Sequence, residues 1–305
     1  MENYKNFWDE KASTTVGAYS AVDGSVDEDV LQATGKYTAA QVHAALGLTQ
    51  SSRVLELGCG VGRIGYWLAP QIAYWHGVDI SYNMIEVARR RLQARGAFGL
   101  DVLARSDLAM LAEESFDAAY CIAVFIHMDK EDFFLYLREL RRVLKPGGSI
   151  FFDTWNLAHP IGWRRFAFEV TTHERSEQRQ RKDVARNQFC TPQEVDIYLR
   201  QAGFEVISLM TDSPWVQAIA ITGADAATAT AARARALSLQ SQIAYPQIWT
   251  DFFNAILDIL NNAVHPSGLY QSIEDSPESP EKAVFLPWLR SMWRQHSKQW
   301  GPLPD

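Results

Sequence analysis

Residues 54–63, with the sequence VLELGCGVGR, constrain the fold more than any other part of this chain. The apolar run is typical of a buried strand, which ends on Glu56 and passes into a loop containing Gly58, Gly60 and Gly62. Because glycine has no Cβ, a ligand can reach the backbone of such a loop at the carboxyl end of a strand. The stretch therefore predicts a strand–loop–helix unit that binds a ligand.

A second acid follows at the distance expected of the next parallel strand. Gly77–Asp79 closes a short strand-like segment, roughly twenty residues beyond the glycine loop. In a parallel βαβ unit this spacing places a carboxylate on the hydroxyl groups of a ribose. A nucleoside cofactor is therefore the first hypothesis.

The glycine loop by itself leaves two cofactors open. Residues 60–65 satisfy the pattern G-x-G-x-x-G, which is typical of NAD and FAD sites but weak when it stands alone. Glu56 precedes this loop, and a carboxylate there would repel a pyrophosphate while suiting a sulfonium with an amino acid end. The acid thus favours a cationic cofactor.

Five short motifs follow one another along the chain. They are the acid and glycine loop Glu56–Gly62, the acid Asp79, the acid Asp107 after a third strand, the strand opening Phe116-Asp117 with Val124–Met128 beyond it, and the helix and turn Leu140–Gly148. In this order and at this spacing they resemble the motifs of the class I S-adenosylmethionine-dependent methyltransferases. The resemblance covers roughly residues 50–222.

The resemblance implies an α/β fold: a Rossmann-like sheet of seven strands, mostly parallel, with the last strand antiparallel beside the fifth and helices on both faces. The sequence agrees, because short apolar segments alternate with segments of helical periodicity. Strands are predicted near residues 53–57, 74–79, 99–104, 116–122, 149–154, 204–209 and 216–221. One helix is predicted to begin after Thr191 as N-cap, with Glu194 completing a capping box.

The resemblance also implies S-adenosylmethionine as cofactor, with S-adenosylhomocysteine as product, and assigns residues to it. Glu56 and the backbone near Gly58 and Cys121 would hold the methionine end, and Asp79 would bind both ribose hydroxyls. Adenine would lie between Ile80 and Met84, with the side chain of Asp107 and the amide of Leu108 on its edge. The full expected set is Glu56, Gly58, Cys59, Gly60, Gly62, Asp79, Ile80, Met84, Asp107, Leu108 and Cys121.

Two residues are candidates for catalysis, His127 after the fourth strand and Asp153 at the end of the fifth. A histidine has a suitable pKa for a general base near neutral pH, but this one could equally be a structural residue of its loop. Asp153 could orient an amine or hydroxyl, or bind only water or a helix end. Tyr120 is expected in the core.

The amino-acid composition limits the substrates and the cellular compartment that are expected for this chain. The net charge of −7 argues against a nucleic-acid substrate, since the arginine-rich segment 173–182 is interleaved with acids and amides and is typical of a solvated helix face. The three cysteines are far apart, which predicts neither disulfide nor metal site and fits a reducing cytoplasm. We expect no membrane segment and no signal peptide, since the first residues are polar and no apolar run reaches spanning length.

The chain is predicted to have three parts: a leader (1–35), a methyltransferase core (36–222) and a helical C-terminal extension (223–305). The leader could fold over the cofactor as a lid or pack as a surface helix. In the extension, helices are predicted near 224–244, 245–264 and 282–300, with a loop over 266–280. Its aromatic stripe favours packing, with a homodimer contact or a pocket wall as alternatives.

The leading interpretation is a cytoplasmic enzyme that methylates an N, S or O atom of a small metabolite. Aromatic residues could stabilise a cationic product through cation–π contacts; the candidates are Trp8, Tyr19, Trp155 and Trp163. Alternatives are a methyltransferase acting on tRNA or protein, an NAD-dependent oxidoreductase, for which no hydride-site motif is present, and a catalytically silent binding protein.

Overall fold

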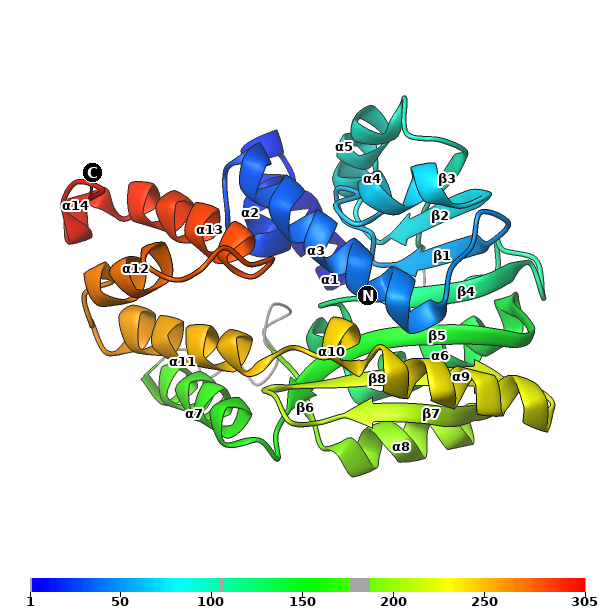
Figure 1. The fold of residues 1–305 in the computed structure, drawn as a ribbon. Coiled ribbons are helices and arrows are strands. Elements are labelled where there is room, and N and C mark those ends of the chain that lie inside the picture. The colour runs from blue at the N-terminus through cyan, green and yellow to red at the C-terminus, as the bar shows by residue number, and fades with distance from the viewer. Residues whose placement is uncertain (1, 105–106, 176–186, 305) are drawn as a thin grey trace.

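The computed structural model describes residues 2–104, 107–175 and 187–304. At its centre lies a sheet in the order β3-β2-β1-β4-β5-β8-β7, with β6 paired to β5 off this path (Figure 1). The strands are β1 (Arg53–Leu57), β2 (Tyr74–Asp79), β3 (Phe98–Val102), β4 (Phe116–Cys121), β5 (Leu144–Asn156), β6 (Phe189–Cys190), β7 (Phe204–Met210) and β8 (Trp215–Thr222). Strand β8 runs antiparallel to both β5 and β7, and the other pairs are parallel. The predicted fold class is confirmed, with the two-residue β6 as an addition.

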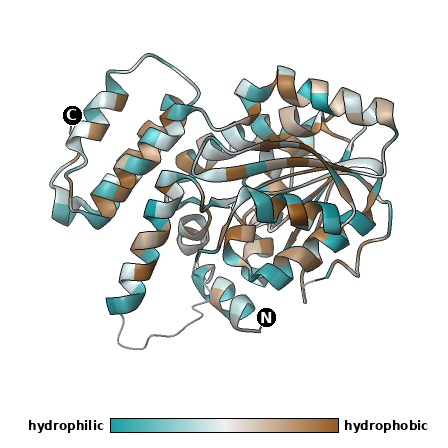
Figure 2. Ribbon diagram, turned by 90° about the horizontal axis from the view of Figure 1, so that it is seen from below, coloured by the Kyte–Doolittle hydropathy of each residue, from teal (hydrophilic) through white to brown (hydrophobic). Residues whose placement is uncertain are grey.

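Helices cover both faces of this sheet, as the buried strands require. The helices are α1 (Glu2–Lys11), α2 (Thr15–Asp23), α3 (Glu28–Leu46), α4 (Gly65–Leu68), α5 (Tyr82–Leu92), α6 (Lys130–Val143), α7 (Pro160–Arg175), α8 (Pro192–Gln201), α9 (Ala226–Ser238), α10 (Gln240–Ile243), α11 (Gln247–Asn261), α12 (Ser267–Glu274), α13 (Lys282–Gln295) and α14 (Ser297–Trp300). One core cluster joins the sheet to α6 and α8, and the other joins it to α3, α4, α5, α9 and α10. Figure 2 shows the strands largely in brown between helices of mixed hydropathy.

Two local predictions illustrate how the sequence encodes these elements. Helix α8 begins as expected: the Thr191 hydroxyl accepts from the Glu194 amide, and the Glu194 carboxylate accepts from the Thr191 amide. Strand β5 starts earlier than expected, at Leu144, so residues 146–148 lie within it rather than before it. Pairing with β4 jumps from Leu144 to Ser149, which means that the predicted turn survives as a bulge in the strand.

The predicted loop over residues 266–280 is wrong in its first half, where helix α12 forms. Its serine and glycine content suggested a loop, but Tyr270 and Ile273 lie three residues apart and are buried against α13. Tertiary packing of that apolar pair therefore overrides the local turn signal. The arginine-rich segment 173–182 lies mostly outside the described residues, which include only its first part at the end of α7.

The leader and the C-terminal extension pack on each other at the carboxyl end of the strands. Helix α3 runs without a break across the expected boundary at residue 35, and it packs against α13. The indole N–H of Trp288 donates to the carbonyl of Asp23 at 2.8 Å, and the hydroxyls of Ser25 and Ser291 lie 3.1 Å apart. The aromatic stripe of the extension is thus used for packing within the chain.

No helix among the described residues combines the length and the apolar character needed to cross a membrane.

Candidate functional site

The glycine loop after β1 has the backbone shape that its sequence predicts. Gly58, Gly60 and Gly62 have φ values of 71°, 50° and 70°, a region that residues with a Cβ rarely adopt. A Cβ on Gly58 would also lie 2.4 Å from Cγ2 of Val124. The loop therefore needs glycine both for its conformation and for its close contact with the segment after β4.

Asp79 ties two loops together at the end of β2. Its Oδ2 accepts the amide N–H of Gly60 at 2.8 Å, and its Oδ1 accepts that of Ser81 at 2.9 Å. The residue is only 9% exposed, and burial raises the pKa of its carboxyl to about 6. Since a carboxylate oxygen can accept more than one hydrogen bond, Asp79 keeps acceptor capacity for a diol.

A chain of buried hydrogen bonds holds Glu56 at the end of β1. The hydroxyl of Tyr120 donates to Oε2 of Glu56 at 2.5 Å, and the indole N–H of Trp75 donates to the Tyr120 oxygen at 2.8 Å. Burial raises the pKa of Glu56 to about 8. Tyr120 is a core residue as predicted, and its hydroxyl also orients the motif acid, which the sequence alone did not indicate.

The leader covers this region. Tyr4, Trp8, Ala21 and Val22 line the same cavity as the glycine loop. Helix α1 is fixed to the loop after β2, because Oδ1 of Asp9 accepts from the hydroxyl of Ser81 at 2.6 Å and from the amide of Asn83 at 3.2 Å. The leader therefore lines the cavity that holds the expected cofactor residues, and its role as a lid stays a prediction.

The cavity brings together eight of the expected site residues. They are Glu56, Gly58, Cys59, Gly60, Asp79, Ile80, Met84 and His127. The other expected residues, which do not line it, are Gly62, Asp107, Leu108, Cys121 and Asp153.

Each of those five residues has a different local role. Gly62 packs near Ala88 and Leu92, and Cys121 is fully buried. The amide of Leu108 donates to the carboxylate of Glu139 at 3.0 Å, and its expected contact with adenine stays a prediction. Asp107 follows residues outside the described part, and its Oδ1 accepts the amide of Ala109 at 3.3 Å. Its expected contact with adenine stays a prediction.

His127 lies in a short 3-10 turn, Phe125–His127, and its ring packs 5.0 Å from that of Trp8. Its Nδ1 is buried without a hydrogen-bond partner among the described residues. Burial lowers the pKa of the imidazole to about 4. At neutral pH the ring is therefore uncharged and able to accept a hydrogen bond.

Asp153 departs from its expected position. It is 2% exposed, and its Oδ1 accepts the amide N–H of Ala123 at 2.6 Å while its Oδ2 accepts the hydroxyl of Tyr245 at 3.3 Å. Its carboxylate thus lies behind the cavity wall, where it supports the turn after β4. The predicted contact with a methyl acceptor is not what this geometry provides.

Arg63 was missing from the expected set. Among the described residues that line the cavity, it is the only lysine or arginine, and its Nη1 donates to the hydroxyl of Thr38 at 3.2 Å. Glu56 and Arg63 together bring a carboxyl group and a guanidinium to the lining of this cavity. The sequence could have indicated this residue, because Arg63 directly follows Gly62, the last glycine of the loop.

This donor set fits a nucleoside with a zwitterionic tail. Gly58 and Gly60 line the cavity with backbone alone, the Asp79 carboxylate suits a diol, and the pair of Glu56 and Arg63 suits an ammonium with a carboxylate. Ile80 and Met84 add apolar surface for a flat ring. No group of three potential metal ligands occurs among the described residues.

Comparisons with known proteins agree with this geometry. A family model described as "Methyltransferase domain" matches residues 54–148. The chain is 36% identical over 128 residues to Methyltransferase GfsG of Streptomyces halstedii, a match that covers 40% of this chain and 44% of that protein. It is 30% identical over 178 residues to the Ubiquinone biosynthesis O-methyltransferase of Xanthomonas oryzae pv. oryzae (strain PXO99A), covering 57% of this chain and 72% of the relative.

The fold of this chain is also similar to that of a solved methyltransferase structure. Magnesium protoporphyrin IX methyltransferase from Synechocystis PCC 6803, with bound S-adenosylhomocysteine, aligns with a TM-score of 0.53 at 18% identity, covering 71% of this chain and 98% of that one. At this identity the similarity concerns the fold. The structural alignment covers only part of this chain. The match to GfsG spans less than half of that relative's length.

Proposed function

Because this chain belongs to the class I S-adenosylmethionine-dependent methyltransferases, we propose that it methylates an oxygen, nitrogen or sulfur atom of a small molecule. S-adenosylmethionine supplies a methyl group on a positively charged sulfur, and S-adenosylhomocysteine is the product. The observation that carries the proposal is the covered cavity, in which the leader residues Tyr4 and Trp8 face the turn that carries His127. We place the acceptor in this cavity, next to the rings of Trp8 and His127.

The cofactor end of the cavity has a role for each side chain. We assign the cofactor's ammonium to Glu56, its carboxylate to Arg63 and its ribose hydroxyls to Asp79. Tyr120 keeps the Glu56 carboxyl in place, and the Gly60 and Ser81 amides keep the Asp79 carboxyl in place. Fixing the cofactor in this way aligns it for in-line transfer, which is the main protein contribution that such a reaction requires.

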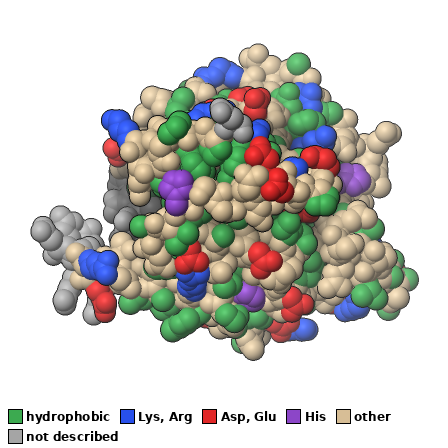
Figure 3. Space-filling view, turned by 60° about the vertical axis from the view of Figure 1, so that its left-hand side comes forward, with side chains coloured by type: hydrophobic (Ala, Val, Ile, Leu, Met, Phe, Trp, Pro, Cys, Tyr) green, Lys and Arg blue, Asp and Glu red, His purple; other side chains and the backbone are tan. Residues whose placement is uncertain are grey.

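The charge of the protein favours a small acceptor over a nucleic acid. The chain carries a net charge of −7, and on the face shown in Figure 3 the basic side chains are scattered among acidic ones. Nucleic-acid sites need a continuous basic surface instead. A hydroxyl is the first acceptor group to test, because relatives of this chain carry the name Ubiquinone biosynthesis O-methyltransferase.

A panel of defined acceptors tests the proposal. The full chain is incubated with methyl-labelled S-adenosylmethionine and, separately, with phenols, aliphatic alcohols, amines and thioethers, and products are detected by mass spectrometry. Formation of a methylated product from at least one class, at a rate that saturates with acceptor, supports the proposal. Labelling of tRNA or protein, with none of the small acceptors methylated, contradicts it.

His127→Ala should lower kcat roughly 10²-fold, because the neutral imidazole accepts a hydrogen bond or proton from the acceptor. At saturating S-adenosylmethionine, the wild-type kcat should stay level between pH 8 and pH 6, since the pKa of His127 is lowered to about 4 and the ring stays neutral over this range. His159→Ala is the matched control, because His159 lies outside the residues lining the cavity and its Nδ1 accepts the Ile161 amide. Equal rates in both variants would remove His127 from the reaction.

Binding of S-adenosylhomocysteine should release up to about one proton per site at pH 7, and its affinity should rise between pH 6 and pH 8. The pKa of Glu56 is raised to about 8, so this carboxyl is mostly protonated at pH 7. A neighbouring ammonium favours the ionised form. Calorimetry in two buffers of different ionisation enthalpy measures the release, and Glu56→Gln should abolish it. The same release from both proteins would contradict the role of Glu56.

A further inference from the structure

The turn after β4 has a backbone conformation that is unusual for its residue. Ala123 has a φ of 58°, which residues with a Cβ rarely adopt and which persists only where surrounding contacts enforce it. Ile122, Ala123 and Val124 all line the cofactor cavity. Because Val124 also lies against Gly58, the shape of this turn affects the glycine loop directly.

Asp153 supplies the contact that enforces this conformation. Its Oδ1 accepts the amide N–H of Ala123 at 2.6 Å, and its neighbour Phe152 pairs with Cys121 in the sheet. A buried carboxylate needs more than one partner, and the partners of Asp153 come from distant parts of the chain. Arg63, on the cavity side, is the cation that acts on it electrostatically.

The second hydrogen-bond donor comes from the C-terminal extension. The hydroxyl of Tyr245, which lies between α10 and α11, donates to Oδ2 of Asp153 at 3.3 Å. Burial and the nearby carboxylate raise the pKa of Tyr245 well above its usual value, so its hydroxyl stays protonated and acts as the donor. The Tyr245 ring packs 4.8 Å from the ring of Trp215 and 5.4 Å from that of Trp249.

Two buried glutamines fix the position of Tyr245. Gln217 of β8 is the cross-strand partner of Asp153, and its Oε1 accepts the amide of Tyr245 at 2.8 Å. Its Nε2 donates to the carbonyl of Ile243 at 3.0 Å, and Nε2 of Gln41 donates to the same carbonyl at 3.1 Å. The extension is therefore bound to the sheet by a satisfied polar network next to the site.

We propose that Tyr245 and Asp153 are positioning residues, and that through them the C-terminal extension holds the turn at Ala123 in the shape that binds the methyl donor. On this account the extension completes the cofactor site and is more than a packing module. The inference rests on the methyl-donor half of the proposed function, and its test needs no methyl acceptor. A failed acceptor screen therefore leaves it standing.

Calorimetric titration of the full chain with S-adenosylhomocysteine tests the proposal. Asp153→Ala should raise Kd about tenfold or more, since it removes a charged acceptor from the Ala123 amide. Tyr245→Phe, which removes only the hydroxyl, should raise Kd about three- to tenfold. Asp153→Asn should restore much of the affinity lost in Asp153→Ala, because an amide oxygen can still accept from Ala123.

Tyr270→Phe is the matched control, because it removes a hydroxyl that donates to Glu274 within the extension, away from the cavity. It should leave Kd unchanged even if it lowers the melting temperature. Hydrogen exchange at the Ala123 amide should be faster in Asp153→Ala and Tyr245→Phe than in wild type. Wild-type Kd values in folded Asp153→Ala and Tyr245→Phe, together with unchanged exchange at the Ala123 amide in both variants, would overturn the proposal.

Discussion

Asp79→Ala should weaken binding of S-adenosylhomocysteine by roughly 10- to 100-fold, the largest effect expected of a single side chain in the site. The carboxylate has two functions: it accepts the amides of Gly60 and Ser81, and it is assigned to the ribose hydroxyls. Its removal takes a charged acceptor from a buried position and frees the glycine loop. Calorimetry or equilibrium dialysis measures the effect on Kd.

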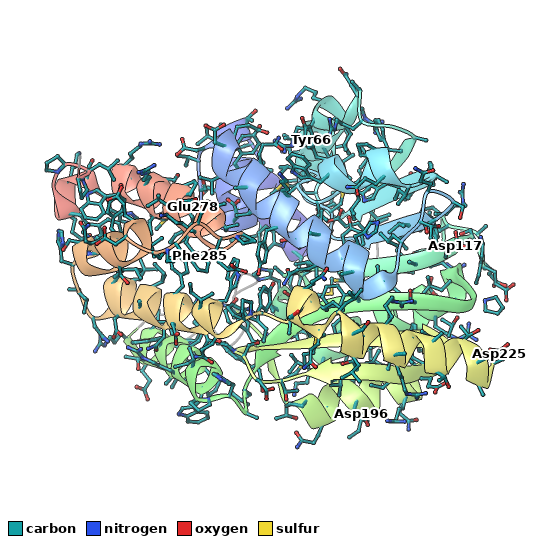
Figure 4. All side chains as sticks on the ribbon, in the orientation of Figure 1. Tyr66, Asp117, Asp196, Asp225, Glu278 and Phe285 are labelled. Carbon is teal, nitrogen blue, oxygen red and sulfur yellow. The ribbon has the colours of Figure 1, made fainter. Side chains whose placement is uncertain are left out.

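Asp117→Ala is the control for this variant. Asp117 also accepts a backbone amide, that of Arg53 at 2.8 Å, and it pairs with Lys145, but it lies at the opposite end of the sheet (Figure 4). This substitution should lower stability and leave Kd unchanged. If both variants bind the ligand as wild type does, Asp79 has no place in the cofactor site.

A chain truncated after residue 222 should fail to form a soluble, ligand-binding protein. Helix α13 of the extension packs against α3, and the indole N–H of Trp288 donates to the carbonyl of Asp23 in the leader. Deleting it exposes the other side of that contact and leaves Gln41 and Gln217 without the carbonyl of Ile243. Expression of residues 1–222, followed by size-exclusion chromatography and calorimetry, tests this expectation. A monomeric product with wild-type affinity would make the extension an accessory.

Phe285→Ala tests the packing of the extension with a single substitution instead of a deletion. The ring of Phe285, labelled in Figure 4, stacks on Phe252 of α11 with 4.0 Å between centroids, and the residue is 1% exposed. Its loss should lower the free energy of unfolding by about 3–5 kcal/mol. Chemical denaturation of the full chain measures this value. A loss well below that range would mean that the cluster around Phe285 stabilises the fold little.

The sequence predicted the parts of the site that are local in the chain. The strand that carries Glu56, the glycine loop and Asp79 are each recognisable within a few residues, because backbone geometry and strand–loop–helix spacing fix their positions. The antiparallel last strand beside the fifth followed from the resemblance. The capping box at Thr191 was predictable for the same reason, since it uses one residue and its third neighbour.

Contacts between distant segments were not predictable in this way. Tyr245 follows Asp153 by 92 positions. Neither residue type indicates this pairing, so the sequence left open whether Asp153 contacts an acceptor or has a structural role, and the fold shows it hydrogen-bonded to Ala123 and Tyr245. The role of Tyr120 was hidden similarly: an aromatic residue in a strand is expected in the core, and only the fold shows its hydroxyl on Glu56. Helix α12 was missed because its packing partners lie in another helix.

The most direct test of the proposal that this chain methylates a small molecule is to follow a labelled methyl group from S-adenosylmethionine to its product. The full chain is incubated with methyl-labelled S-adenosylmethionine and a cell extract separated into small-molecule, tRNA and protein fractions. The account predicts that the label passes into the small-molecule fraction, and that Asp79→Ala reduces this transfer. Label found only in tRNA or protein would contradict the account.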